Sequence, residues 1–131
     1  MQITRQTEYA IKTMLELARN EDDKYLSSKF ISKQQDIPED FLKKTIKLLA
    51  VADLVVTQRG SQGGVKLARS AQTINLAQII KAIEGPIALN ICLGPGYKCP
   101  NQPGCTISAA LAKAQVAMLK VLEGQILSDM I

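Results

Sequence analysis

The stretch SSKFISKQQDIPEDFLKKTIKLLAVADLVVTQRGSQGGVKL, residues 27–67, decides the fold class of this chain. One of the two serines at its start can cap a short helix over 29–35, because a serine hydroxyl accepts a backbone N–H of the first helical turn. The turn 36–38 (DIP) follows, and its proline suits the first position of a new helix. That second helix is expected to extend to about Ala52, so the sequence predicts two helices joined by a tight turn.

The second of these helices has two chemically different faces. At about 100° per residue, one broad face collects mainly apolar side chains, namely Phe41, Leu42, Thr45, Ile46, Leu48, Leu49 and Ala52. The opposite face carries Lys43, Lys44 and Lys47, with Asp40 among them. Lysines attract phosphates and can bond guanine edges. The face is therefore either an ordinary solvated surface or a DNA-reading surface, and the helix order before it favours DNA.

A hairpin follows the two helices. Residues 54–58 (LVVTQ) are rich in β-branched side chains, 59–64 (RGSQGG) form a glycine-rich turn, and 65–67 return as a second strand. This order predicts a mainly α fold, a winged helix-turn-helix with a two-stranded β wing. Arg59 is either a solvated tip residue or a side chain that enters a minor groove. The candidate DNA-binding residues are Ser28, Lys29, Asp40, Lys43, Lys44, Lys47, Arg59, Gly60 and Lys66.

Helices are also predicted on both sides of this unit. Residues 4–18 form an amphipathic helix with Thr4 as its cap, and 76–84 form another that ends at Gly85. A long helix is expected over 106–129, with a 4-3-4-3 apolar seam of Ile107, Leu111, Ala114, Met118 and Val121. The seam predicts a homodimer interface. We expect a DNA-binding domain over 1–72 and a cysteine loop with dimerisation helices over 73–131.

Three cysteines, Cys92, Cys99 and Cys105, lie in a Gly- and Pro-rich loop with the spacing Cys-x6-Cys-x5-Cys. Such a loop buries little, which disfavours a purely structural role for the thiols. Structural zinc sites usually contain closely spaced cysteine pairs, and these are absent from the sequence. Soft thiolates suit iron–sulfur clusters, and Lys98 beside Cys99 favours the thiolate form. The cysteines therefore predict a metal or redox site, with an iron–sulfur cluster favoured over zinc.

Composition excludes several other functions. The chain contains no histidine, which rules out a Ser-His-Asp or Cys-His pair and any zinc site that uses imidazole. The sequence contains no Gly-rich phosphate loop and no paired-carboxylate motif that would indicate an enzyme. No signal peptide and no apolar run of about 18 residues is found, so a cytoplasmic protein without a membrane partner is expected. The net charge of +4 weakly favours an anionic partner.

Taken together, these segments resemble the IscR/NsrR/CymR family of bacterial transcription regulators. The resemblance rests on residues 3–10 (ITRQTEYA), 37–42, 52–55, 59–64, 76–85 and the cysteine triplet. It implies a homodimer that binds a double-stranded DNA operator. It also implies a 2Fe–2S or 4Fe–4S cluster that responds to redox, nitric oxide or iron status and changes DNA binding. By position, Lys43 and Lys44 match base-reading residues and Arg59 matches the wing arginine.

The chain departs from the family pattern at four positions. Lys43 and Lys44 replace the Glu and Gln of the iron–sulfur assembly regulator, so the operator should differ. Val65 stands where an aromatic residue is common, and Ser108 replaces the histidine that completes the assembly regulator's cluster site.

Three thiolates leave a four-ligand cluster site one ligand short. The resemblance points to Glu8 of the partner chain as the missing ligand, although the helix dipole alone also favours an acidic residue there. Two other functions stay open on the sequence. One is a cluster-free regulator of the same fold, controlled by a protein partner or by thiol oxidation. The other is a structural zinc-binding interaction module.

Overall fold

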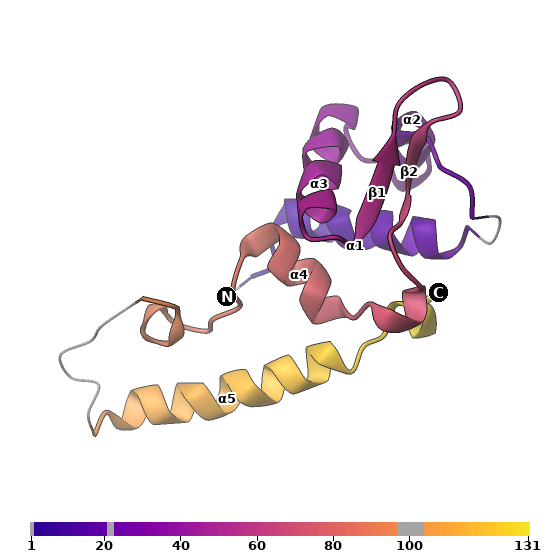
Figure 1. Ribbon diagram of the computed structural model, residues 1–131. Helices are drawn as coiled ribbons and strands as arrows, with labels where there is room; N and C mark the ends of the chain where they lie inside the picture. Colours follow the sequence, from indigo (N-terminus) through magenta and orange to yellow (C-terminus); the bar gives the residue numbers. More distant parts are fainter. Residues whose placement is uncertain (1, 21–22, 97–103) are drawn as a thin grey trace.

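The computed structural model describes residues 2–20, 23–96 and 104–131. Helix α1 (Arg5–Ala18) begins after Thr4, whose hydroxyl accepts the N–H of Thr7 at 3.2 Å. Its apolar stripe, which includes Ala10, Met14 and Leu17, is buried in the hydrophobic core of the protein. The predicted helix and its cap are therefore confirmed, and Figure 1 shows α1 lying beneath the next two helices.

Helices α2 (Ser28–Gln35) and α3 (Glu39–Val51) form the helix-turn-helix. Asp36 ends α2 in the left-handed region with φ of 53°, and Pro38 takes the N-cap position of α3, one residue before the predicted one. Phe41, which we expected on the buried face of α3, remains 46% exposed. Its ring lies at the edge of the core and contacts the edge of Tyr9, with ring centroids 6.0 Å apart.

The wing is an antiparallel pair of β1 (Val55–Gln58) and β2 (Gly64–Leu67), in a register that places Val55 opposite Leu67. Leu26 extends this pair through two backbone hydrogen bonds with Val65, of 2.9 and 2.8 Å. A Cβ atom on Gly64 would lie 2.2 Å from the carbonyl oxygen of Leu26, so close packing of the wing itself requires this glycine. The predicted mainly α winged helix-turn-helix is confirmed.

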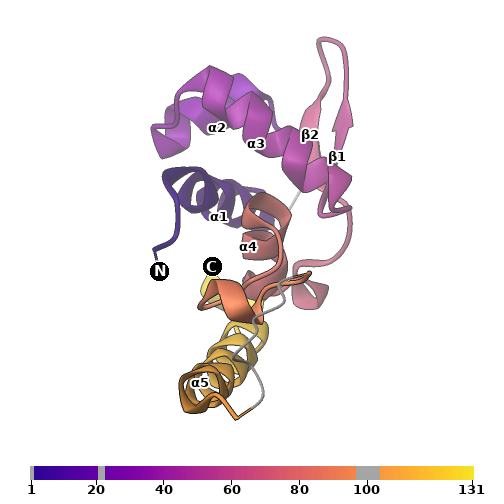
Figure 2. The ribbon, with the colours of Figure 1, turned by 90° about the vertical axis from the view of Figure 1, so that its left-hand side faces the viewer.

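Two further helices follow the wing, α4 (Leu76–Glu84) and α5 (Thr106–Glu123), with short 3-10 helices η1 (Ala71–Thr73), η2 (Ile91–Leu93) and η3 (Leu127–Met130). Helix α4 packs on α1 and α3, whereas α5 lies apart from them at the far side of α4 (Figures 1 and 2). Of the helices in the described ranges, none is long and apolar enough to cross a membrane.

Helix α5 is shorter than predicted, because it ends at Glu123 rather than at residue 129. The chain turns back there and pairs with the segment before α4. The N–H of Leu76 donates to the carbonyl of Gln125 at 2.9 Å, and the N–H of Leu127 donates to Ile74 at 2.8 Å. These bonds replace the last predicted helical turns and fix the end of α5 to the rest of the molecule.

One hydrophobic core contains residues from both sides of the predicted domain boundary near residue 72. Met14 and Leu49 lie in it together with Ile74 and Leu127, all completely buried. The division of the chain into domains 1–72 and 73–131 stays a prediction. Leu127, which lies in η3, joins the C-terminal end of the chain to this core.

Candidate DNA-binding groove and cysteine segment

A groove of about 780 Å³ lies between α3 and the wing, and we call it the helix–wing groove. It is lined by Ser28, Lys43, Ile46, Lys47, Thr57, Gln58, Arg59, Gly60, Gly64 and Val65. Five of the nine predicted DNA-binding residues lie in it. Three of these carry positive charge, so the groove has the basic, concave surface that suits a phosphate backbone.

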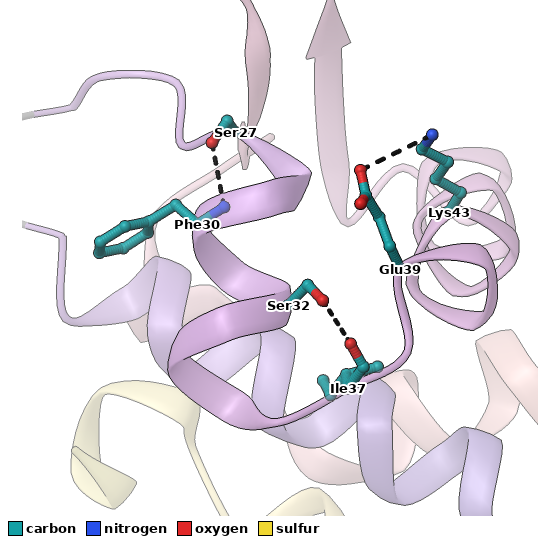
Figure 3. Close-up of polar contacts among 6 residues, drawn as sticks. All are labelled: Ser27, Phe30, Ser32, Ile37, Glu39 and Lys43. Atoms are coloured by element: carbon teal, nitrogen blue, oxygen red, sulfur yellow. Dashed lines mark hydrogen bonds and ion pairs between the residues drawn. The ribbon is translucent and has the colours of Figure 1, made fainter.

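The local structure of α2 and α3 sets this surface, as Figure 3 shows. Ser27 caps α2 by accepting the N–H of Phe30 at 3.1 Å. The Ser32 hydroxyl donates to the carbonyl of Ile37 and fixes the turn between the helices. On α3, the Lys43 ammonium lies 3.8 Å from the Glu39 carboxylate. Both side chains are largely exposed, and such a pair is weak, so Lys43 can exchange this carboxylate for a phosphate or a base.

Four predicted DNA-binding residues lie outside the helix–wing groove. The Lys44 ammonium sits 5.9 Å from the centre of the Phe41 ring. Asp40 is exposed on α3, and Lys29 lines a separate hollow beside Tyr9. Lys66 lies 3.7 Å from Asp23 and faces a different hollow, beside the end of α1. Its place in DNA binding therefore stays a prediction that the groove does not support.

Sequence reasoning missed two polar residues of the helix–wing groove, Thr57 and Gln58. Both are exposed at the end of β1, directly before Arg59. Their position in the sequence could have identified them, because polar side chains directly before the wing-tip arginine have the same access to DNA as the arginine.

The cysteine segment begins in η2 and ends at the start of α5. Cys92 and Cys105 are both half-buried, unpaired thiols. The Ser108 hydroxyl lies 3.9 Å from the sulfur of Cys92, and the Ser108 N–H donates to the sulfur of Cys105 at 3.4 Å. One serine thus connects two of the three cysteines. Cys99 lies in the segment 97–103, outside the described residues, and no three His, Cys, Asp or Glu side chains of the remaining chain gather as a metal site.

A hydrogen bond joins the end of α4, which precedes the cysteine segment, to the first turn of α1. The buried Thr7 hydroxyl donates to the carboxylate of Glu84, the last residue of α4, at 2.7 Å. Glu8 is the next residue of α1, and its side chain is half exposed and pairs with Lys12 at 3.4 Å. Within one chain, Glu8 is therefore an accessible carboxylate rather than part of the described cysteine site.

None of the 18 residues of α5, all of which are described, is buried. One face leans on α4 and η2 and is half-buried, comprising Ser108, Leu111, Ala112, Gln115, Met118, Leu119 and Leu122. A second face is exposed and apolar, comprising Ile107, Ala110, Ala114, Ala117 and Val121, and we call it the α5 stripe. The structure thus divides the predicted seam, because Leu111 and Met118 turn toward their own chain and Ile107, Ala114 and Val121 do not.

Known proteins share this architecture along its whole length. The Rrf2 family, described as iron-dependent transcriptional regulators, matches residues 3–131. The chain is 35% identical over 132 residues to the HTH-type transcriptional regulator NsrR of Oceanobacillus iheyensis, which covers all of this chain and 90% of the relative. The NsrR of Halalkalibacterium halodurans is 31% identical over 132 residues, with 100% and 90% covered.

Two solved structures are similar in sequence and in fold. CymR, the global cysteine regulator of B. subtilis, gives a TM-score of 0.81 at 26% identity, with 99% of this chain and 95% of that chain covered. The IscR of T. potens gives 0.78 at 26% identity, with 99% and 85% covered. The resemblance found in the sequence is confirmed. Proteins of this family are DNA-binding transcription regulators and not enzymes. The chain belongs to the Rrf2 family of transcription regulators.

Proposed function

We propose that this protein is a homodimeric, sequence-specific regulator whose DNA binding depends on an iron–sulfur cluster held by Cys92, Cys99 and Cys105. The main observation in support of the cluster is that the sulfurs of Cys92 and Cys105 both contact Ser108, one through its hydroxyl and the other through its N–H. The relatives named NsrR and the description of the family as iron-dependent support the same conclusion.

The helix–wing groove is the DNA contact in this proposal. Lys43 and Lys47 of α3 enter the major groove, where lysine bonds guanine edges, and Arg59 at the wing tip reaches the adjacent minor groove. Ser28 at the start of α2 contacts a phosphate, since helix N-termini and hydroxyls are common phosphate ligands. Gly60 has a φ of 110°, and a Cβ atom added to it would meet no other atom within 4 Å, so the wing backbone at this point is open to approach by DNA.

The α5 stripe forms the dimer interface in this proposal. Ile107 and Val121 are 68% and 61% exposed at its two ends, with three alanines between them. An exposed apolar stripe of this kind is stabilised by pairing with a second copy of the chain, because pairing removes its apolar surface from water. Two heads related by a two-fold axis then read half-sites about one DNA turn apart, or a multiple of it.

The donor set fits an iron–sulfur cluster. Two soft sulfurs contact the same serine, and the third cysteine lies between them in the sequence. In this proposal Glu8 of the partner chain completes the set, because its carboxylate is half exposed and it follows Thr7, whose hydroxyl is bonded to Glu84. A bound cluster would supply a redox-sensitive or nitric-oxide-sensitive link between the cysteine segment of one chain and Glu8 in α1 of the partner chain. Without that link, the cysteine segment would no longer restrain the partner's α1 and the DNA-reading head packed on it.

The experiment for this function compares DNA binding with and without the cluster. Protein purified without oxygen is analysed for iron, sulfide and visible absorption, and DNA sites are selected from a random pool. Binding to the selected site is expected to weaken or strengthen at least tenfold when the cluster is removed by a chelator. Colourless, iron-free protein that binds DNA normally would contradict the proposal and favour control by thiol oxidation or a protein partner. Zinc in place of iron would favour a structural metal.

A second test separates base reading from general attraction to DNA. Lys47→Ala is expected to reduce the discrimination between selected and random DNA by about 1–3 kcal/mol, because a base contact is lost. Arg59→Ala should cost most on sites with a narrow, A·T-rich minor groove. Lys66→Ala is the matched control, since its ammonium pairs with Asp23 outside the helix–wing groove, and it should leave discrimination unchanged. Fluorescence anisotropy at several salt concentrations measures these effects. Equal losses for all three variants on every sequence would overturn this assignment.

A further inference from the structure

The surroundings of the two described cysteines contain polar groups directed at both sulfurs. Besides Ser108, the side-chain amide of Asn90 donates to the sulfur of Cys92 at 3.6 Å. The carbonyl oxygen of the same amide accepts the N–H of Ile91 at 3.0 Å. Because the two ends of the amide have different partners, its nitrogen is held toward the sulfur. Cys92 therefore lies between two hydrogen-bonding side chains, one from the residue before η2 and one from α5.

The position of Ser108 follows from the start of α5. Cys105 is the N-cap of this helix, and its sulfur accepts the N–H of Ser108, three residues later. This bond sets the first turn of α5 and places the Ser108 hydroxyl opposite Cys92. A further bond, from the N–H of Leu89 to the side-chain oxygen of Gln115 at 2.9 Å, holds the segment before η2 against α5. The two sulfurs are thus oriented by the fold before any metal is bound.

We propose that Ser108 and Asn90 are positioning residues for the iron–sulfur cluster, and that their hydrogen bonds to the Cys92 sulfur raise the reduction potential of the cluster. The inference rests on the proposed cluster function. A hydroxyl both accepts and donates hydrogen bonds. It accepts from the Cys92 thiol in metal-free protein and donates to the same sulfur once that sulfur is a thiolate bound to iron. Ser108 is not a ligand in this arrangement, and the fourth ligand comes from elsewhere.

The expected consequence follows from the charge on the cluster. Hydrogen bonds to ligand sulfurs withdraw negative charge and favour the reduced cluster, which carries one more electron. Ser108→Ala removes the hydroxyl and keeps the backbone N–H that bonds Cys105. It is expected to lower the midpoint potential. It should also weaken retention of the cluster against a chelator by roughly 10- to 100-fold, the usual effect of removing an outer-shell partner. Asn90→Ala is expected to act in the same direction.

The test measures midpoint potential, visible circular dichroism and chelator resistance of anaerobically reconstituted protein. Ser108→Thr keeps a hydroxyl at this position and should therefore keep the wild-type potential. Thr106→Ala is the matched control, since it removes an exposed hydroxyl from the same helical turn. Wild-type protein that assembles no cluster would refute the proposed function itself. A cluster of unchanged potential and stability in Ser108→Ala would refute only the role of Ser108. A folded Ser108→Ala protein that cannot assemble the cluster would make Ser108 a ligand and also overturn the inference.

Discussion

Replacement of Ala114 by aspartate is expected to convert the proposed dimer into monomers and to abolish binding to a two-fold DNA site. Ala114 lies in the middle of the α5 stripe and is exposed in a single chain, so the aspartate leaves the fold of the protomer intact. In the dimer it would bury an unpaired charge, at a cost of about 3–5 kcal/mol. That cost corresponds to a roughly 100-fold or greater rise in the dimer dissociation constant. Sedimentation equilibrium measures the dimer, and a mobility shift on the selected site measures DNA binding.

Val116→Asp is the matched control for this experiment. Val116 is also exposed, at 67%, but it lies two residues further along the helix and so about 200° away around its axis. The Val116→Asp protein should remain a dimer. Leu111→Asp is also expected to weaken the dimer, because Leu111 lies on the same helix next to the α5 stripe. However, Leu111 packs partly against its own chain, so this change should lower the stability of the protomer as well. A dimeric Ala114→Asp protein, or equal dissociation by Val116→Asp, would move the interface to another surface.

Loss of one thiolate is expected to eliminate the cluster. Cys105 both binds iron in our proposal and caps α5, so alanine would remove two functions at once. Cys105→Ser separates them, because serine is a good helix cap but a hard, poorly deprotonated ligand. We expect Cys105→Ser to fold with normal helix content and to contain little or no iron after anaerobic reconstitution. Cys99→Ala should lose the cluster in the same way. Full iron occupancy in either variant would exclude that cysteine as a ligand.

Removal of Glu8 should have a smaller and different effect. Glu8→Ala is expected to keep iron but to shift the absorption and circular dichroism spectra and the sensitivity to nitric oxide, because a carboxylate is the weakest ligand of the set. Lys12→Ala is the control, since it breaks the ion pair within the chain and leaves the carboxylate in place. Spectra of Glu8→Ala identical to those of the wild type would rule Glu8 out as the fourth ligand.

The sequence alone determined the features that arise from short-range interactions. The cap Thr4, a serine cap at position 27 or 28, the turn at 36–38 and the glycine-rich hairpin all depend on residues within a few positions of one another. The basic face of α3 follows from helical periodicity. These local rules were sufficient to predict the winged helix-turn-helix and half of the residues that line the helix–wing groove, including Lys43, Lys47 and Arg59.

Only the tertiary structure decided the features that depend on distant partners. Helix α5 ends at Glu123 because residues 125–127 bond to Ile74 and Leu76, about fifty residues away. The predicted seam divides because Leu111 and Met118 face α4 and η2, a contact that an apolar repeat cannot foretell. In the sequence Ser108 marked only the place of an absent histidine, whereas in the fold its hydroxyl and N–H lie beside two sulfurs. Periodicity and capping are local, but burial and side-chain partners are set by which surfaces the folded chain brings together.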